Sequence, residues 1–232
     1  MPYSKTIVCL ANSRKYQGRC VAGLEWNGRS VGKWIRPVSG MDKGVLVYER
    51  FCSNSNGRDP RLLDLISIEF LVPQPHAFQS ENHRIDPCKR WVHKGSVRWQ
   101  QLLGALERPK GPLWTNRRST KNGMNDIVSE GDALELQRSL LLVQPNDLTI
   151  SVSMEPSSSG ELKRRLRGAF CLDGFDYVFS VTDCRIEQEM TSYDSGQEKM
   201  YRKPILCLSL SEVMPSQGAC FKLIAGVIPT GM

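Results

Sequence analysis

The chain has 232 residues, of which 40% are hydrophobic and 24% charged, enough for one large or two small globular domains with a buried core. Lysine and arginine number 31 against 24 aspartates and glutamates, and this net charge of +7 favours polyanionic partners. No apolar run approaches the ~20 residues that a membrane span requires, and the first ten residues lack the apolar core of a secretory signal. We therefore expect a cytoplasmic protein that does not bind membranes.

The first 75 residues read as short strands with polar connections. The strand-like segments are 5–11, 19–26, 33–38 and 62–72. A further short element is expected at 45–48, and the Ser-, Asn- and Gly-rich stretch 52–61 is typical of an exposed loop. Because this region shows no helical period, it predicts a five-stranded barrel or a sandwich.

Residues 76–136 differ in kind. Between 83 and 121 there are ten lysines and arginines against two acidic residues, and three of the five tryptophans, Trp91, Trp99 and Trp114, lie among them. Apolar residues at helical spacing predict one amphipathic helix over 97–106, packed on the β-units. The polar, basic segment 115–125 is expected to be a mobile, exposed loop.

From residue 139 the strand pattern returns. The segments are 140–144, 148–152, 163–172, 177–182, 205–210 and 221–228, and the connection 183–203 is polar. The chain is therefore expected to be mainly β, with a five-element β-unit at each end and a basic, partly helical insert between them.

The segment 33–38 and the basic loop 12–19 before it are the first candidate site. In an extended strand Trp34 and Arg36 share one face, which places an indole for stacking beside a guanidinium for phosphate. The alternative is that Trp34 is a core residue and Arg36 caps a turn.

Metal and catalytic motifs are sparse. The eight cysteines form no CxxC pair and are most simply small buried hydrophobic residues, although Cys88 with His93, His83 and His76 leaves a zinc site as an alternative. No HExxH, GxSxG, GxxxxGK[ST] or GxGxxG motif is present, and His83 is the candidate general base if the chain is an enzyme. We expect no catalytic residue and no cofactor.

Several segments together resemble the dual OB-containing domain family of prokaryotes. They are 7–15, 18–23, 33–39, Gln79-Ser80-Glu81-Asn82, 181–183, 206–210 and 221–228, and they cover nearly the whole chain. The resemblance implies two OB-like barrels, at 1–75 and 137–232, flanking the basic insert at 76–136. The role proposed for that family is recognition of nucleic acid, often within conflict or defence loci.

On the OB template, the early strands and their loops bind oligonucleotides. The first-choice contacts are Arg14, Lys15, Tyr16, Arg19, Trp34 and Arg36, and further candidates are Gln79, Asn82, Arg117 and Arg118. The motif at 79–82 could instead hold a metal or pin the insert to the first barrel. The cationic run 163–167 and the loop 117–121 either contact phosphates or form solvated, charged edges.

The leading functional hypothesis is a non-catalytic module that binds nucleic acid, preferably single-stranded, through cationic and aromatic side chains. A sensor of a small or modified nucleotide in a cleft between the barrels is the second hypothesis. An adaptor for another protein, such as an effector encoded nearby, is the third.

Overall fold

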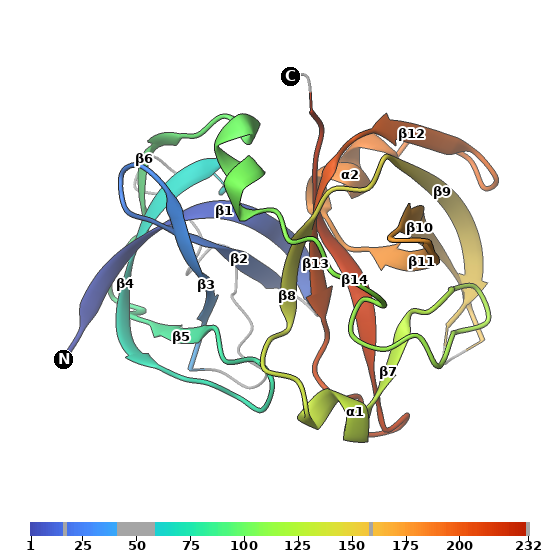
Figure 1. Cartoon of the computed structure of the whole chain (residues 1–232), viewed down its shortest axis with the longest axis horizontal. Coiled ribbons are helices and arrows are strands. Elements are labelled where there is room, and N and C mark those ends of the chain that lie inside the picture. Colours follow the sequence, from blue (N-terminus) through green and yellow to red (C-terminus); the bar gives the residue numbers. More distant parts are fainter. Residues whose placement is uncertain (16–17, 41–58, 158–159, 231–232) are drawn as a thin grey trace. The chain divides into compact units, whose positions relative to one another are not determined.

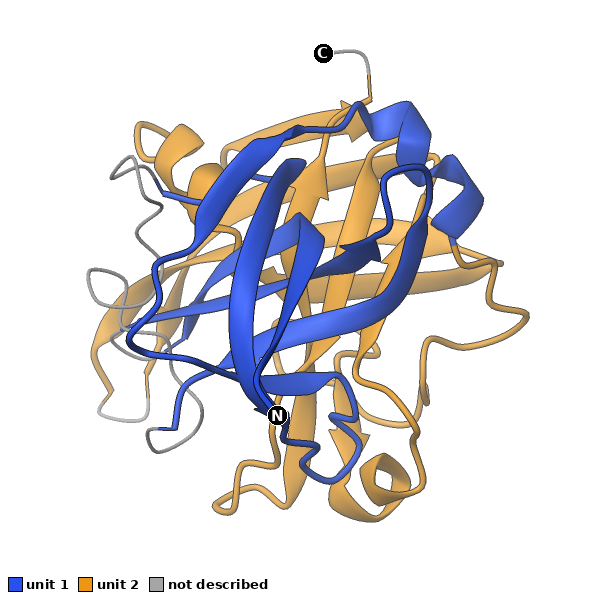
Figure 2. Cartoon of the chain, turned by 90° about the vertical axis from the view of Figure 1, so that its left-hand side faces the viewer, with its two compact units in different colours: residues 1–106 blue, residues 107–232 orange. Residues whose placement is uncertain are grey.

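The computed structural model describes residues 1–15, 18–40, 59–157 and 160–230, and it is mainly β with a few short helices (Figure 1). The elements are β1 Tyr3–Lys15, β2 Gly18–Trp26, β3 Val31–Val38, β4 Asp64–Pro73, β5 Asn82–Ile85, β6 Val92–Ser96, the 3-10 helix η3 Trp99–Ala105, β7 Ile127–Ser129, α1 Glu130–Leu134, β8 Leu140–Val143, β9 Asp147–Pro156, β10 Leu162–Leu172, β11 Phe175–Val181, α2 Cys184–Glu189, β12 Glu198–Arg202, β13 Ile205–Leu210 and β14 Ala219–Ile228. The chain divides into two compact units, Met1–Leu106 and Glu107–Met232 (Figure 2). The short element expected at 45–48 lies outside the described residues.

The first unit contains a closed five-stranded barrel. Its strands follow the order β1-β2-β3-β5-β4, and β4 pairs with β1 to close the ring, while β6 is added to β4. Only β3 and β5 are parallel neighbours in this ring. In β4, buried Ile66, Ile68 and Phe70 alternate with partly exposed residues, which is the period of two that a barrel wall requires. The closed barrel expected in the first part of the chain is therefore present, but its fifth strand, β5, lies beyond the expected bounds 1–75.

Glycine is required where β1 and β2 approach each other most closely. The register of this pair shifts between Cys9 and Ala11, opposite Gly23. A Cβ atom on Gly23 would lie 2.0 Å from the carbonyl oxygen of Val8, a backbone atom that cannot move aside. The bulge and the missing side chain together let the ring bend at this point.

The second unit contains an open sheet. Its order is β12-β9-β10-β11-β14-β13-β8, and the five central strands repeat the ring order of the first unit, with β11 and β14 as the parallel pair. Closure would require β9 to pair with β13, but in the described residues β9 is paired with β10 and β12, and β13 with β14 and β8. Both edges of each strand are therefore occupied, and the prediction of a second closed barrel was wrong.

The segment expected as an insert, 76–136, is divided between the units. β5, β6 and η3 belong to the first unit, whereas β7 and α1 belong to the second. The helix expected over 97–106 is the short 3-10 helix η3, which buries Leu102. The polar connection 183–203 holds α2, capped by the Asp183 side chain, and β12. No helix in the described part of the chain is both long and apolar enough to span a bilayer.

A fork opens in the second sheet between β11 and β14. These strands pair only at Ser180–Val181 with Leu223–Ile224. Beyond that point Met124 pairs with Val178 on β11, and β7 pairs with Ala219 to Phe221 on β14. The segment that precedes β7 therefore lies between β11 and β14, and this segment includes the basic loop predicted at 115–125.

We predict that Gly23→Ala lowers the free energy of unfolding by about 1–3 kcal/mol or more, because the new methyl group overlaps a backbone oxygen. Urea unfolding followed by circular dichroism measures the change. Gly32→Ala on β3 is the matched control, since the nearest atom to its Cβ would be 3.6 Å away. Equal stability of the two variants would contradict this account of the bulge.

Candidate nucleic-acid interface

The outward face of β10 carries three cations. Leu166, Gly168 and Phe170 of this strand are buried and face inward, so Lys163, Arg165 and Arg167 lie on the opposite face. Lys163 and Arg165 are exposed, and their side chains make no hydrogen bond or ion pair with any residue that the structure describes. Their positive charge is therefore available to solvent.

Arg167 is the centre of a buried polar network on the same face. Its guanidinium donates to both carboxylate oxygens of Glu155 at 2.8 and 2.7 Å and to the hydroxyl of Ser180 at 2.9 Å. A carboxylate oxygen of Asp126 lies 3.7 Å away. The hydrogen bonds from Arg167 lower the pKa of Glu155 to about 2, so this carboxylate is ionised and its charge is compensated at neutral pH.

The basic loop 118–127 is tied to this network. A bridge between Arg118 and Ile127 closes the loop at its base. Inside it, buried Asp126 accepts hydrogen bonds from the backbone N–H of Thr120 at 2.7 Å and from its hydroxyl at 2.6 Å. A hydrogen bond from Asn122 to Glu155 joins the loop to the sheet, while Arg118 and Lys121 remain exposed. The loop expected at 115–125 is therefore exposed, as predicted, and anchored to the cationic face.

Lys222 of β14 anchors the chain just before the loop. Its side chain is 1% exposed, and Nζ donates to the carbonyl oxygen of Thr115 at 2.5 Å and to Oδ1 of Asn116 at 3.0 Å. The rings of Tyr177 and Phe179 lie 5.6 and 5.7 Å from Nζ. Burial lowers the pKa of Lys222 to about 7, although nearby Asp126 opposes the shift.

Sequence reasoning missed Lys222 and Asp126. The available signal for Lys222 was that it is the single charged residue in the apolar segment 219–228. The partners of both residues lie far from them in the sequence or within an irregular loop, so their contacts could not be inferred from spacing. Arg117, which was predicted, is largely exposed and lies 3.5 Å from Asp132.

The cations predicted in the first unit gather at the end of the β1–β2 hairpin. Arg14 and Arg19 are directly opposed, and Lys15 is opposite Gly18, while Tyr16 lies outside the described residues. Arg14 and Arg19 continue the inward-facing row of Val21, at the end of the barrel. Lys15 is on the alternate row of side chains, which faces outward. The structure thus brings three predicted cations together, but it divides them between two faces.

Trp34 and Arg36 share the outward face of β3, since Ile35 between them is in the core. Trp34 is half-buried and is opposite Leu24. Arg36 is 3% exposed, and its guanidinium lies 3.2 Å from the Glu81 carboxylate. The indole and the guanidinium are thus neighbours on the strand, with the guanidinium buried in an ion pair.

Gln79 and Asn82 are also buried, and the Asn82 amide donates to the Gln79 side-chain oxygen at 3.2 Å. The backbone N–H of Arg36 donates to the carbonyl oxygen of Glu81 at 2.8 Å. Through these bonds the turn before β5 is held against β3.

The histidines of the first unit have other partners. His83 Nδ1 lies 2.5 Å from the Tyr3 hydroxyl, and burial lowers the pKa of this histidine. His93 pairs with Asp64 at 3.2 Å, whereas Cys88 is exposed. Within the described ranges, no group of three or more His, Cys, Asp or Glu side chains is placed to hold a metal ion.

We predict that the stability of the protein rises with pH through Lys222. Below pH 7 this lysine is protonated in both states, and the folded state bears the full cost of a buried charge. Between pH 7 and its ordinary pKa of 10.5, only the unfolded chain keeps the proton, so stability increases by up to about 1.4 kcal/mol per pH unit. Urea unfolding at several pH values, compared with Lys222→Met, isolates this contribution.

The matched control is Lys110→Met, which removes an exposed lysine from the same unit and should keep the rise of stability with pH that Lys222 causes. A constant difference between the wild-type protein and Lys222→Met from pH 6 to 10 would refute the assignment.

Comparison with known proteins gives one family. The family model described as the dual OB-containing domain matches residues 5–227, which includes strands of both units. No curated protein and no solved structure matches the chain. The closed ring of the first unit and the repeated ring order of the second agree with that description. The chain belongs to the dual OB-containing domain family.

Proposed function

We propose that the chain is a non-catalytic module that binds single-stranded nucleic acid along β10 and the loop 118–127 of its second unit. The observation that carries the proposal is that exposed Lys163 and Arg165 share one face with carboxylates that Arg167 already compensates. The loop anchored to this face adds exposed Lys121. Such a face attracts phosphates, because binding releases the counterions that surround a nucleic acid.

The position of this face within the fold supports the proposal. OB folds bind oligonucleotides on the face of their second and third strands and on the flanking loops. In the ring order of the second unit, β10 and β11 occupy these places. Glu198 of β12 stands on the same outward row as Ser151 and Arg167. Because the Glu198 carboxylate would repel phosphates at the β12 edge, we expect the phosphates to follow β10 and the basic loop.

The first unit would supply a second contact. Its equivalent strands are β2 and β3, where Trp34 lies on the outward face together with the row of Lys15. Arg14 and Arg19 at the hairpin end add positive charge nearby. Stacking on Trp34 would be tolerant of sequence, since every base has an aromatic face.

The proposal assigns a recognition role and no reaction to the chain. A single-strand-binding module of this kind would act in the cytoplasm, within a prokaryotic defence system, and could deliver its ligand to a genomically linked effector protein. The first quantity to establish is the binding itself.

We predict that the double charge reversal K163E/R165E weakens binding to single-stranded DNA and RNA of any sequence. Loss of two phosphate contacts should also flatten the dependence of log K on log salt by about 1.4, at roughly 0.7 per contact. Fluorescence anisotropy with labelled 20-nucleotide strands at several salt concentrations measures both quantities.

Two further variants with the same change in net charge make the test specific. K89E/R90E alters exposed cations between β5 and β6 and should leave the salt slope unchanged. R14E/K15E tests the hairpin of the first unit. Undiminished affinity of K163E/R165E, or wild-type binding that does not depend on salt, would reject the proposed face.

A further inference from the structure

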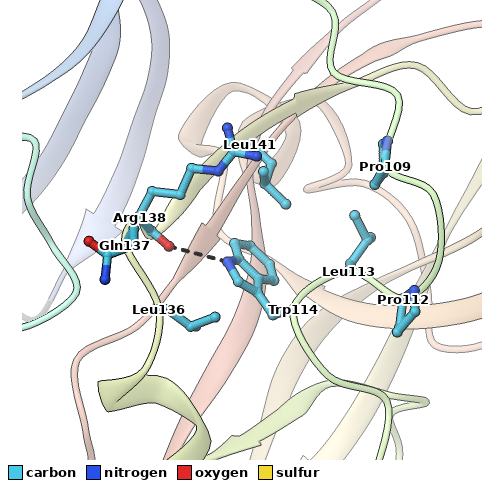
Figure 3. Close-up of a pocket in the computed structure, with 8 residues that line it drawn as sticks. All are labelled: Pro109, Pro112, Leu113, Trp114, Leu136, Gln137, Arg138 and Leu141. Atoms are coloured by element: carbon cyan, nitrogen blue, oxygen red, sulfur yellow. Dashed lines mark hydrogen bonds between the residues drawn. The ribbon is translucent and has the colours of Figure 1, made fainter.

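A pocket of about 250 Å³ opens beside the basic loop of the second unit (Figure 3). Its walls come from two segments, 109–114 and 136–141. Most of the lining is apolar and is provided by Pro109, Pro112, Leu113, Leu136 and Leu141. Figure 3 shows the indole of Trp114 in the middle of these side chains, and Gln137 and Arg138 complete the lining.

Trp114 is held in an unusual conformation. Its φ is +56°, a left-handed value that a bulky side chain adopts at a cost of about 1–3 kcal/mol. The indole Nε1 donates to the carbonyl oxygen of Arg138 at 3.3 Å, which fixes the ring, and the side chain packs against the core of the unit. The hydrogen bond of Nε1 and the packing against the core thus fix the indole ring, which also lines the pocket.

The chemistry of the pocket suits a flat heteroaromatic ring. An indole offers a stacking surface, and the surrounding proline and leucine side chains are apolar. The Arg138 guanidinium at the pocket rim is 58% exposed and is paired with the Glu107 carboxylate. A dry apolar cavity of about 150 Å³ already admits benzene, so a volume near 250 Å³ accommodates a base-sized ring.

The pocket is connected to the basic loop by a short stretch of chain. Only Thr115 and Asn116, both bound by Lys222, separate Trp114 from Arg117 and Arg118. Four residues of extended chain, from Trp114 to Arg118, span at most about 14 Å. A strand whose phosphates follow the basic loop can therefore place one base at Trp114.

We infer that this pocket receives one unstacked nucleobase, stacked on Trp114, from a strand that runs along β10 and the loop 118–127. The inference rests on the proposed function and adds a specific position to it. It also makes one end of the bound strand distinct, because a base at that end occupies a pocket while the others lie on an open face.

The test compares base-bearing and abasic strands. Labelled 12-nucleotide adenine strands, intact or with one abasic position at the 5′ or the 3′ end, are titrated by anisotropy against the wild-type protein and Trp114→Leu. Wild-type protein should lose about fivefold or more in affinity at one of the two ends, which is the size of a base–aromatic stacking contact. Trp114→Leu should bind all three strands with equal, reduced affinity and an unchanged salt slope, since no cation is removed.

Two further variants guard the interpretation. Trp99→Leu removes a partly exposed tryptophan of the first unit and should keep the abasic discrimination. Leu136→Trp fills the pocket and should abolish the discrimination even if Trp114→Leu is too unstable to assay. Quenching of tryptophan fluorescence by adenosine monophosphate, lost in Trp114→Leu, would support the pocket with a free nucleotide as its source.

The outcomes separate the two proposals. Salt-dependent binding with no loss on either abasic strand, and no quenching by the mononucleotide, overturns the pocket while the cationic face stands. No binding to any strand at low salt overturns the proposed function, and the pocket inference with it.

Discussion

The second unit depends on the buried side-chain nitrogen of Lys222. β11 and β14 separate on the N-terminal side of Ser180 and Leu223, and the segment before β7 fills the resulting fork. An irregular segment inside a sheet has backbone groups that need partners, and the Lys222 side chain supplies one for Thr115. The rings of Tyr177 and Phe179 flank the same nitrogen. The position of the basic loop, and of the pocket before it, follows from this anchor.

Charge compensation explains why the outward face of β10 is cationic. The charge of Arg167 compensates the carboxylates of Glu155 and Asp126. These two acids can therefore anchor the loop without repelling a bound anion. Lys163 and Arg165 have no such task among the described residues. In the first unit Arg36 is buried and paired with Glu81. Its charge therefore stabilises the contact between β3 and the turn before β5. Outward-facing cations of the two units thus have different roles.

The two units share a ring order and differ in closure. In the first, β1 bonds β2 on one edge and β4 on the other, so the sheet meets itself. In the second, β12 and β8 take the hydrogen-bonding edges that closure would use. The extra strands come from segments that the sequence presents as a polar connection and a short apolar run. Edge pairing, rather than strand propensity, decides between a barrel and an open sheet.

The alternation of apolar residues in β4 and β9 was sufficient to predict strands, and the spacing of the early segments was sufficient for the family. Strong period-two patterns report burial directly, whereas β5, β7 and β12 are short strands with mixed composition, and their pairing depends on distant neighbours. The sequence alone also determined the surplus of cations and the exposed basic loop. Only the tertiary structure decided which of those cations are free: Arg36 is buried against a carboxylate and partly buried Arg167 pairs with two, while Lys163 and Arg165 face solvent. That choice rests on contacts between residues far apart in the chain, which no local pattern encodes.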